Sequence, residues 1–181
     1  MPVPQPSPGS EFDVVPAAPA SDWTGFVFSA IVPVVVLAGM LLVAIWTIVT
    51  TVRLRRWVRS GTECQQADWL TLLAEGQRLF GVNGLVTLRT IPRLTSPATC
   101  SWWRPKILLP EDATTWSMTE LRHVLWHELA HIRRHDVASN WGLAFVRVLH
   151  WWNPMFWWAQ RSWLAERELA CDALVLRHLD D

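Results

Sequence analysis

The apolar and polar positions divide the chain into one long uncharged stretch and a following region of shorter patterned segments. No charged side chain occurs from Trp23 to Val52. A helix of about 20 apolar residues is long enough to cross a bilayer. The pattern therefore predicts a transmembrane helix over residues 23–52, with Pro33 either kinking it or marking a late start. Residues 1–22 are rich in Pro, Ala and Ser without an apolar period, and they predict a disordered tail.

A basic segment follows the apolar stretch at once and predicts a juxtamembrane linker over residues 53–63. Its arginines are Arg53, Arg55, Arg56 and Arg59. Positive charge collects on the cytoplasmic side of membrane proteins. We therefore expect an inner-membrane protein, single-pass or more, with its N-terminus outside and residues 64–181 in the cytoplasm. A cleaved signal peptide fits less well because no basic residue precedes the apolar run, and a buried soluble-core helix would be shorter.

Residues 64–181 alternate between helical and strand patterns, which predicts a mainly helical α+β domain with a small sheet. Ser117 and Glu120 match a capping box at the start of a helix, and Asp136 is expected to cap the next one. Loop is expected over residues 92–105. The expected helices are 67–80, 117–134, 137–151 and 155–178, and the expected strands are 85–91 and 106–109.

The stretch Trp141–Gln160 is strongly apolar but is interrupted by polar residues. Arg147, His150 and the Asn153-Pro154 pair lie inside it. Such a break argues against a straight transmembrane helix and favours a helical hairpin. Two versions stay open at this point: an ordinary hairpin in the core, and a hairpin whose Trp-rich tip lies near a membrane.

Composition narrows the class of protein. The 16 basic and 16 acidic residues cancel, so no global field attracts nucleic acid, and no direct nucleic-acid contact is expected. Three cysteines are too few for a disulfide framework and favour a reducing compartment. Tryptophan occurs 14 times and tyrosine is absent, which suits a protein that has membrane lipid among its partners.

The most specific chemical signal is the pentad His127-Glu128-Leu129-Ala130-His131. Histidines four residues apart on a helix lie on one face, one turn above each other. Two imidazoles so placed can bind one zinc ion, and Glu128 can act as general base on an attacking water. The pentad thus predicts Zn²⁺ as cofactor and hydrolysis of a peptide bond. A chance match on a surface helix is the competing interpretation.

A catalytic zinc ion usually takes three protein ligands. His123 and His135 continue the same four-residue spacing, but His127 and His135 are about 12 Å apart along a helix axis. Zinc–nitrogen bonds of about 2 Å cannot join both to one ion together with His131. The same argument excludes His123.

The last expected helix supplies the other candidates for the third ligand. Glu168 and Asp172 are four residues apart and share a face, whereas Glu166 points away from it. We expect Glu168 to bind the metal and Asp172 to accept the free ring N–H of a ligating histidine. Cys171 is also near this face and ranks behind Glu168, because two histidines and one glutamate are a common hydrolytic set.

From about Ser96 onward the chain resembles the BlaR/MecR-type antirepressor membrane metallopeptidases, which are gluzincin-like zinc enzymes with HExxH and ExxxD motifs. The similar segments occur in order over close to half the chain. Besides the pentad, they are Ser96-Pro97, Arg104 to Pro110, Glu120-Leu121, Arg133 to Asp136, His150 to Pro154 and Glu166 to Ala173.

The resemblance implies an integral membrane zinc endopeptidase with a zincin-like cytoplasmic catalytic domain and Glu168 as third ligand. Sensor-type relatives cleave themselves and help to inactivate a transcriptional repressor, so a protein substrate, with a repressor as candidate, is implied here. Two departures stand out. The Ser-x-x-Lys motif of the penicillin-binding domain is absent, because Lys106 is the only lysine and residue 103 is Trp. Only one membrane helix is expected, which fits a truncated piece or a short relative with another input.

Two other functions are compatible with the same residues. One is a quality-control membrane metalloprotease, which would cleave many unfolded membrane proteins rather than one regulator. The other is a non-catalytic membrane-tethered interaction module whose zinc is structural or absent. The sequence offers no well-placed fourth soft ligand for a closed structural site, which weighs against the module.

Overall fold

The computed structural model describes residues 23–179, so the tail expected over residues 1–22 lies outside the described residues. Helix α1 (Trp23–Ser60) contains Pro33 in its interior. Among the described residues, only this helix is long and apolar enough to cross a membrane, over Val27–Ser60. The chain forms two compact units that divide inside α1, one of residues 1–37 and the other of residues 38–181.

The basic segment after the apolar run is helical up to Ser60, where the sequence pattern predicted a linker. Arginine has a high helix propensity, and no helix breaker occurs between residue 53 and Gly61. The helix therefore continues through the arginines and ends one residue before Gly61.

A small mixed sheet forms the centre of the second unit. Strand order is β1 (Thr62–Glu63), β2 (Thr87–Ile91), β4 (Lys106–Pro110), β3 (Ala98–Cys100). β2 and β4 are parallel, and the outer pairs are antiparallel. The two expected strands are confirmed. β3 lies inside the expected loop 92–105, so that prediction is wrong for three residues, which are too few to produce a visible alternation.

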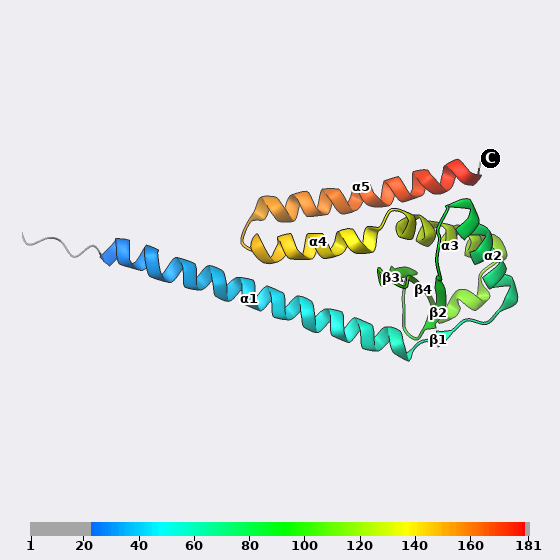
Figure 1. The fold of residues 1–181 in the computed structure, drawn as a ribbon, viewed down its shortest axis with the longest axis horizontal. Helices are drawn as coiled ribbons and strands as arrows, with labels where there is room; N and C mark the ends of the chain where they lie inside the picture. Colours follow the sequence, from blue (N-terminus) through cyan, green and yellow to red (C-terminus); the bar gives the residue numbers. More distant parts are fainter. Residues whose placement is uncertain (1–22, 180–181) are drawn as a thin grey trace, which may run out of the picture. The chain divides into compact units, whose positions relative to one another are not determined.

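The remaining helices agree closely with the sequence pattern. They are α2 (Ala67–Leu79), α3 (Met118–Arg133), α4 (Asp136–Leu149) and α5 (Pro154–Leu179), with a short 3-10 helix η1 (Glu111–Thr115) before α3. α3 packs against α2, α4, α5 and the edge strand β3. Figure 1 shows α4 and α5 running antiparallel next to each other. The fold is thus mainly helical with a small sheet, as predicted.

Helix α3 is oriented by its apolar stripe. Leu121, Leu125 and Leu129 are spaced four apart and are at most 1% exposed, in one cluster with sheet residues. His127 follows Leu125 by two residues, which places it roughly 200° around the helix. Burying the leucines against the sheet therefore turns the histidines of the pentad away from the core and toward α5.

The start of α3 has the expected capping box. The Ser117 hydroxyl accepts the Glu120 backbone N–H at 3.2 Å, and a Glu120 carboxylate oxygen accepts the Ser117 N–H at 2.8 Å. The expectation that Asp136 caps α4 is wrong. The cap residue is His135, with φ 58°, and no side-chain cap bond is present there. Asp136 is buried instead, and its carboxylate bonds elsewhere.

Replacing Leu125 by Ala should destabilise the folded domain by about 2–5 kcal/mol, because the side chain is fully buried between α3 and the sheet. The matched control is Leu70→Ala on α2, where the leucine is 41% exposed and the cost should stay below about 1 kcal/mol. Denaturant unfolding of the full chain in detergent measures both. Equal losses for the two variants would contradict this description of the core.

Candidate metal centre

Two helices bring the sequence-predicted ligands together. α3 supplies His127 and His131, whose Nε2 atoms lie 3.2 Å apart. α5 supplies Glu168, whose Oε2 lies 3.6 Å from His127 Nε2 and 3.5 Å from His131 Nε2. The three donor atoms thus form a nearly equilateral triangle, although Glu168 is far from the histidines in the sequence.

The size of this triangle fits a tetrahedral metal ion. Donor atoms at about 2.0–2.1 Å from a tetrahedral ion are roughly 3.3–3.4 Å apart, and the three observed edges lie close to that spacing. Two imidazole nitrogens and one carboxylate oxygen are also a donor set that zinc accepts. The Glu168 side chain is 48% exposed, so an ion held by these three residues would be accessible to solvent, as a hydrolytic site requires.

Each histidine is held through its other ring nitrogen. Asp172 Oδ1 lies 3.0 Å from His127 Nδ1, and Asp136 Oδ2 lies 2.7 Å from His131 Nδ1. When Nδ1–H donates to a carboxylate, Nε2 carries the free lone pair that a metal needs. Sequence reasoning selected Asp172 for such a contact but missed Asp136, because its position before α4 suggested a helix cap.

A second cluster of possible ligands contains His131, Asp136 and Cys171. The Cys171 sulfur lies 3.3 Å from His131 Nδ1 and 3.6 Å from Asp136 Oδ2. It thus lies at the side of the His131 ring that faces away from Glu168. Burial, reinforced by the charge of Asp136, raises the pKa of the Cys171 thiol to about 12. Cys171 approaches His131 at Nδ1, the ring nitrogen that Asp136 already contacts, and this cluster contains one imidazole. The Glu168 triangle contains Nε2 of both histidines and is therefore the better metal site.

Glu128 lies between the two histidines in sequence and is 6% exposed. The Thr99 hydroxyl donates to Glu128 Oε2 at 2.7 Å, from the edge strand β3. Burial raises the pKa of Glu128, while Thr99 and the two histidines act in the opposite direction. A raised pKa makes this carboxylate a better proton acceptor than an exposed glutamate. Thr99 had no sequence signal, because it lies in the segment expected to be a loop.

The residues that helix geometry excluded as ligands lie outside the triangle, as expected. His123 is exposed on α3, and Glu166 is exposed on α5. His135 occupies a left-handed turn between α3 and α4. In the part of the chain that the structure describes, none of the three joins either cluster of possible ligands.

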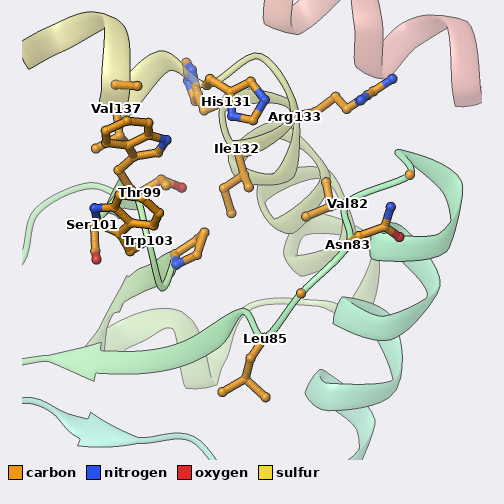
Figure 2. A pocket seen from close by; sticks show the side chains of 16 residues that line it. Val82, Asn83, Leu85, Thr99, Ser101, Trp103, His131, Ile132, Arg133 and Val137 are labelled. Atoms are coloured by element: carbon orange, nitrogen blue, oxygen red, sulfur yellow. The ribbon is translucent and has the colours of Figure 1, made fainter.

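A cavity of about 310 Å³ opens beside the centre. Figure 2 shows Thr99, Ser101 and Trp103 on one wall and Val82, Asn83 and Leu85 on the opposite wall, with Ile132 between them. His131 also lines the cavity. Thr99 lines this cavity and also contacts Glu128. A peptide bound in the cavity would therefore lie next to the candidate general base.

Comparison with known proteins supports a peptidase relationship. A family model described as BlaR1 peptidase M56 matches residues 14–181. A regulatory protein BlaR1 from Bacillus licheniformis is 36% identical over 95 residues, which cover 52% of this chain and 16% of that relative. The aligned part is thus a small fraction of the relative's own length.

Replacing Glu168 by Ala should weaken zinc binding by more than about 100-fold, because removal of a direct ligand costs more than loss of an outer contact. Glu166→Ala is the matched control: it removes the same charge from the same helix but leaves the triangle intact. Zinc titration of the two full-length variants in detergent provides the comparison. If both bind zinc equally, the third ligand is misassigned.

Replacing Asp136 by Ala should weaken zinc binding by about 10–100-fold, since the carboxylate fixes the ring orientation of His131. Asp112→Ala, in the short helix η1, removes a carboxylate that has no contact with the centre. The same titration measures both variants. Parent-like affinity for Asp136→Ala would mean that His131 needs no such partner.

Proposed function

The chain belongs to the BlaR1 peptidase M56 family, and we propose that it is a membrane-anchored zinc endopeptidase that hydrolyses a regulatory protein. The observation that carries this proposal is the triangle of donor atoms from His127, His131 and Glu168, with an open side. A second, independent support is the placement of Glu128 beside this triangle. An isolated HExxH motif would lack both the carboxylate from α5 and the contacts that orient it.

The residues around the triangle divide the catalytic work. A bound zinc ion would activate a water molecule and polarise the scissile carbonyl. Glu128 accepts the proton of that water and passes it to the leaving amine. Thr99 occupies Oε2 of Glu128 with its hydroxyl, which leaves Oε1 free to receive the proton. Asp136 and Asp172 keep the two imidazoles in the tautomer that presents Nε2.

The position of β3 at the edge of the sheet supports the proposal that the substrate is a peptide. β3 pairs with β4 on one side and is last in the strand order, so its other edge is open in the sheet. An exposed strand edge can accept an extended peptide as an added strand. Thr99 is the central residue of β3 and contacts Glu128. A peptide added to this edge would therefore present its backbone carbonyls close to the general base.

The features of helix α1 support the proposal that the protein is attached to a membrane. Its polar side chains are few and locally satisfied: the hydroxyls of Thr47, Thr50 and Thr51 each donate to a carbonyl one turn earlier. Internal satisfaction is what a helix in hydrocarbon requires. The arginines from Arg53 onward support a cytoplasmic position for the C-terminal end of α1 and for the peptidase domain after it, because positive charge collects on that side of membrane proteins.

The family and the regulatory relative favour a signalling substrate. We propose that the protein cleaves a cytoplasmic regulator, with a transcriptional repressor as the first candidate. The match covers 16% of the relative. We therefore do not transfer the signal that activates the relative to this protein.

Replacing Glu128 by Gln should lower cleavage by at least about 100-fold while zinc binding is retained, because the amide cannot accept the proton. The control is Glu111→Gln, which changes an exposed glutamate of η1. Both full chains are expressed in cells, and new protein N-termini are identified by mass spectrometry. The proposal is supported if one regulator is cleaved in cells with the parent or the Glu111→Gln control and is not cleaved in cells with Glu128→Gln.

Two results would count against it. Parent-like cleavage by Glu128→Gln would refute the general base. Many cleaved membrane proteins, without a single dominant regulator, would favour a quality-control protease instead.

A further inference from the structure

The hairpin formed by α4 and the first half of α5 is apolar in sequence but has no core of its own. From Val137 to Ala170 not one residue is buried, and the first buried residue of α5 is Cys171. The two helices nevertheless keep a defined arrangement. An Arg167 N–H donates to Asn140 Oδ1 at 2.7 Å, which joins the start of α4 to the C-terminal half of α5.

Large apolar side chains cover the outside of this hairpin. Trp141, Phe145 and Leu149 are spaced four apart and form an exposed stripe on α4, with Phe145 66% exposed. Met155 and Trp158, at the start of α5, are 73% and 71% exposed. We call the full set the hairpin surface: Trp141, Phe145, Val146, Leu149, Trp152, Met155, Trp157, Trp158 and Trp163. So many exposed large apolar side chains on one helical hairpin indicate a contact with a partner or a membrane.

The charge pattern identifies the kind of partner. Residues 137–165 contain no Asp, Glu or Lys, and the charges are Arg147 and Arg161. The guanidinium carbon of Arg147 lies 5.7 Å from the Trp157 ring centre. Tryptophan and arginine together suit the headgroup region of a bilayer, where indole rings prefer to lie and cations meet anionic lipid. The absence of carboxylates from this segment also avoids repulsion from anionic lipid headgroups.

The lengths of the helices decide how the hairpin can meet the bilayer. α4 has 14 residues, or about 21 Å at 1.5 Å per residue, which is shorter than a hydrocarbon core of roughly 30 Å. α4 therefore cannot cross. The turn is polar, with His150 and Asn153, and Asn153 Oδ1 accepts the Met155 N–H at 2.9 Å. A short hairpin with a polar turn fits one leaflet, not both.

We propose that the hairpin surface inserts into one leaflet of the bilayer, beside α1, where Trp151 of the turn packs against Gly39. The consequence for catalysis rests on the proposed function. The metal centre adjoins the start of α4, through Asp136, while the turn lies at the other end of that helix, about 21 Å away. Insertion of the hairpin would then hold the metal centre near the membrane surface. The enzyme would select substrates in which the cleaved segment lies close to the membrane.

The test places a photoreactive residue on the full chain in vesicles of phosphatidylcholine and phosphatidylglycerol. Benzoylphenylalanine replaces Trp158 in one variant and Phe145 in a second, so that two positions of the hairpin surface are sampled. Leu176 is the matched control, since it lies on the same helix α5 and is 59% exposed. Illumination is followed by mass spectrometry for lipid adducts and by gel electrophoresis for protein adducts.

The expected result is at least about fivefold more lipid adduct at positions 158 and 145 than at position 176. Adducts to a second copy of the chain would overturn the proposal and make the surface a protein interface. Lipid adducts at 158 and 145 no higher than at 176 would also overturn it. Failure of the Glu128→Gln experiment would leave these adducts unchanged, so failure of the proposed function and failure of this inference are distinguishable.

Discussion

The triangle of candidate metal ligands depends on the distance between α3 and α5. α3 carries His127, Glu128 and His131, and α5 carries Glu168 and Asp172. The leucine stripe of α3 fixes the rotation of that helix against the sheet, and buried Cys171 and Val175 fix α5 against the same core. Because donor atoms around a tetrahedral ion must be roughly 3.3–3.4 Å apart, a shift of one helix by 1 Å would open the triangle.

Electrostatics reinforce this geometry. Four carboxylates, those of Glu128, Asp136, Glu168 and Asp172, gather around two imidazoles. Two arginines offset part of this negative charge, because Arg134 Nε lies 3.6 Å from Asp136 Oδ2 and Arg167 Nη2 lies 3.2 Å from Glu168 Oε1. The negative charge that remains favours a bound cation. The carboxylates are also separated by task, because two hold the rings from behind, one faces the open side and one is buried beside Thr99. The same residues could thus attract a metal ion and would position the groups that use it.

Much of the fold and part of the site could be predicted from the sequence, for identifiable reasons. α3 had a capping box and a stripe of leucines, and the HExxH spacing is itself a statement about one helix face. Glu168 could be selected because a carboxylate with another one turn later suits a ligand and its partner. The contacts of Thr99 and Asp136 could not be predicted. Thr99 lies in a strand of three residues, and Asp136 follows a left-handed residue, His135, whose conformation the sequence does not reveal.

The hairpin of α4 and α5 shows the opposite relation between sequence and structure. Its apolar composition was evident, but composition alone left a core hairpin and a membrane hairpin equally open. Exposure separates them, since a core hairpin would contain buried residues and none occurs from Val137 to Ala170. The segment that carries Glu168 into the centre is therefore continuous with the segment that we assign to the membrane.

The most direct test of the account is X-ray absorption spectroscopy of the zinc-loaded full chain. We expect two imidazole nitrogens and two oxygens at about 2.0–2.1 Å from zinc, one oxygen from Glu168 and one from solvent, without sulfur. A sulfur neighbour at about 2.3 Å would place Cys171 in the coordination sphere and would contradict the proposed centre.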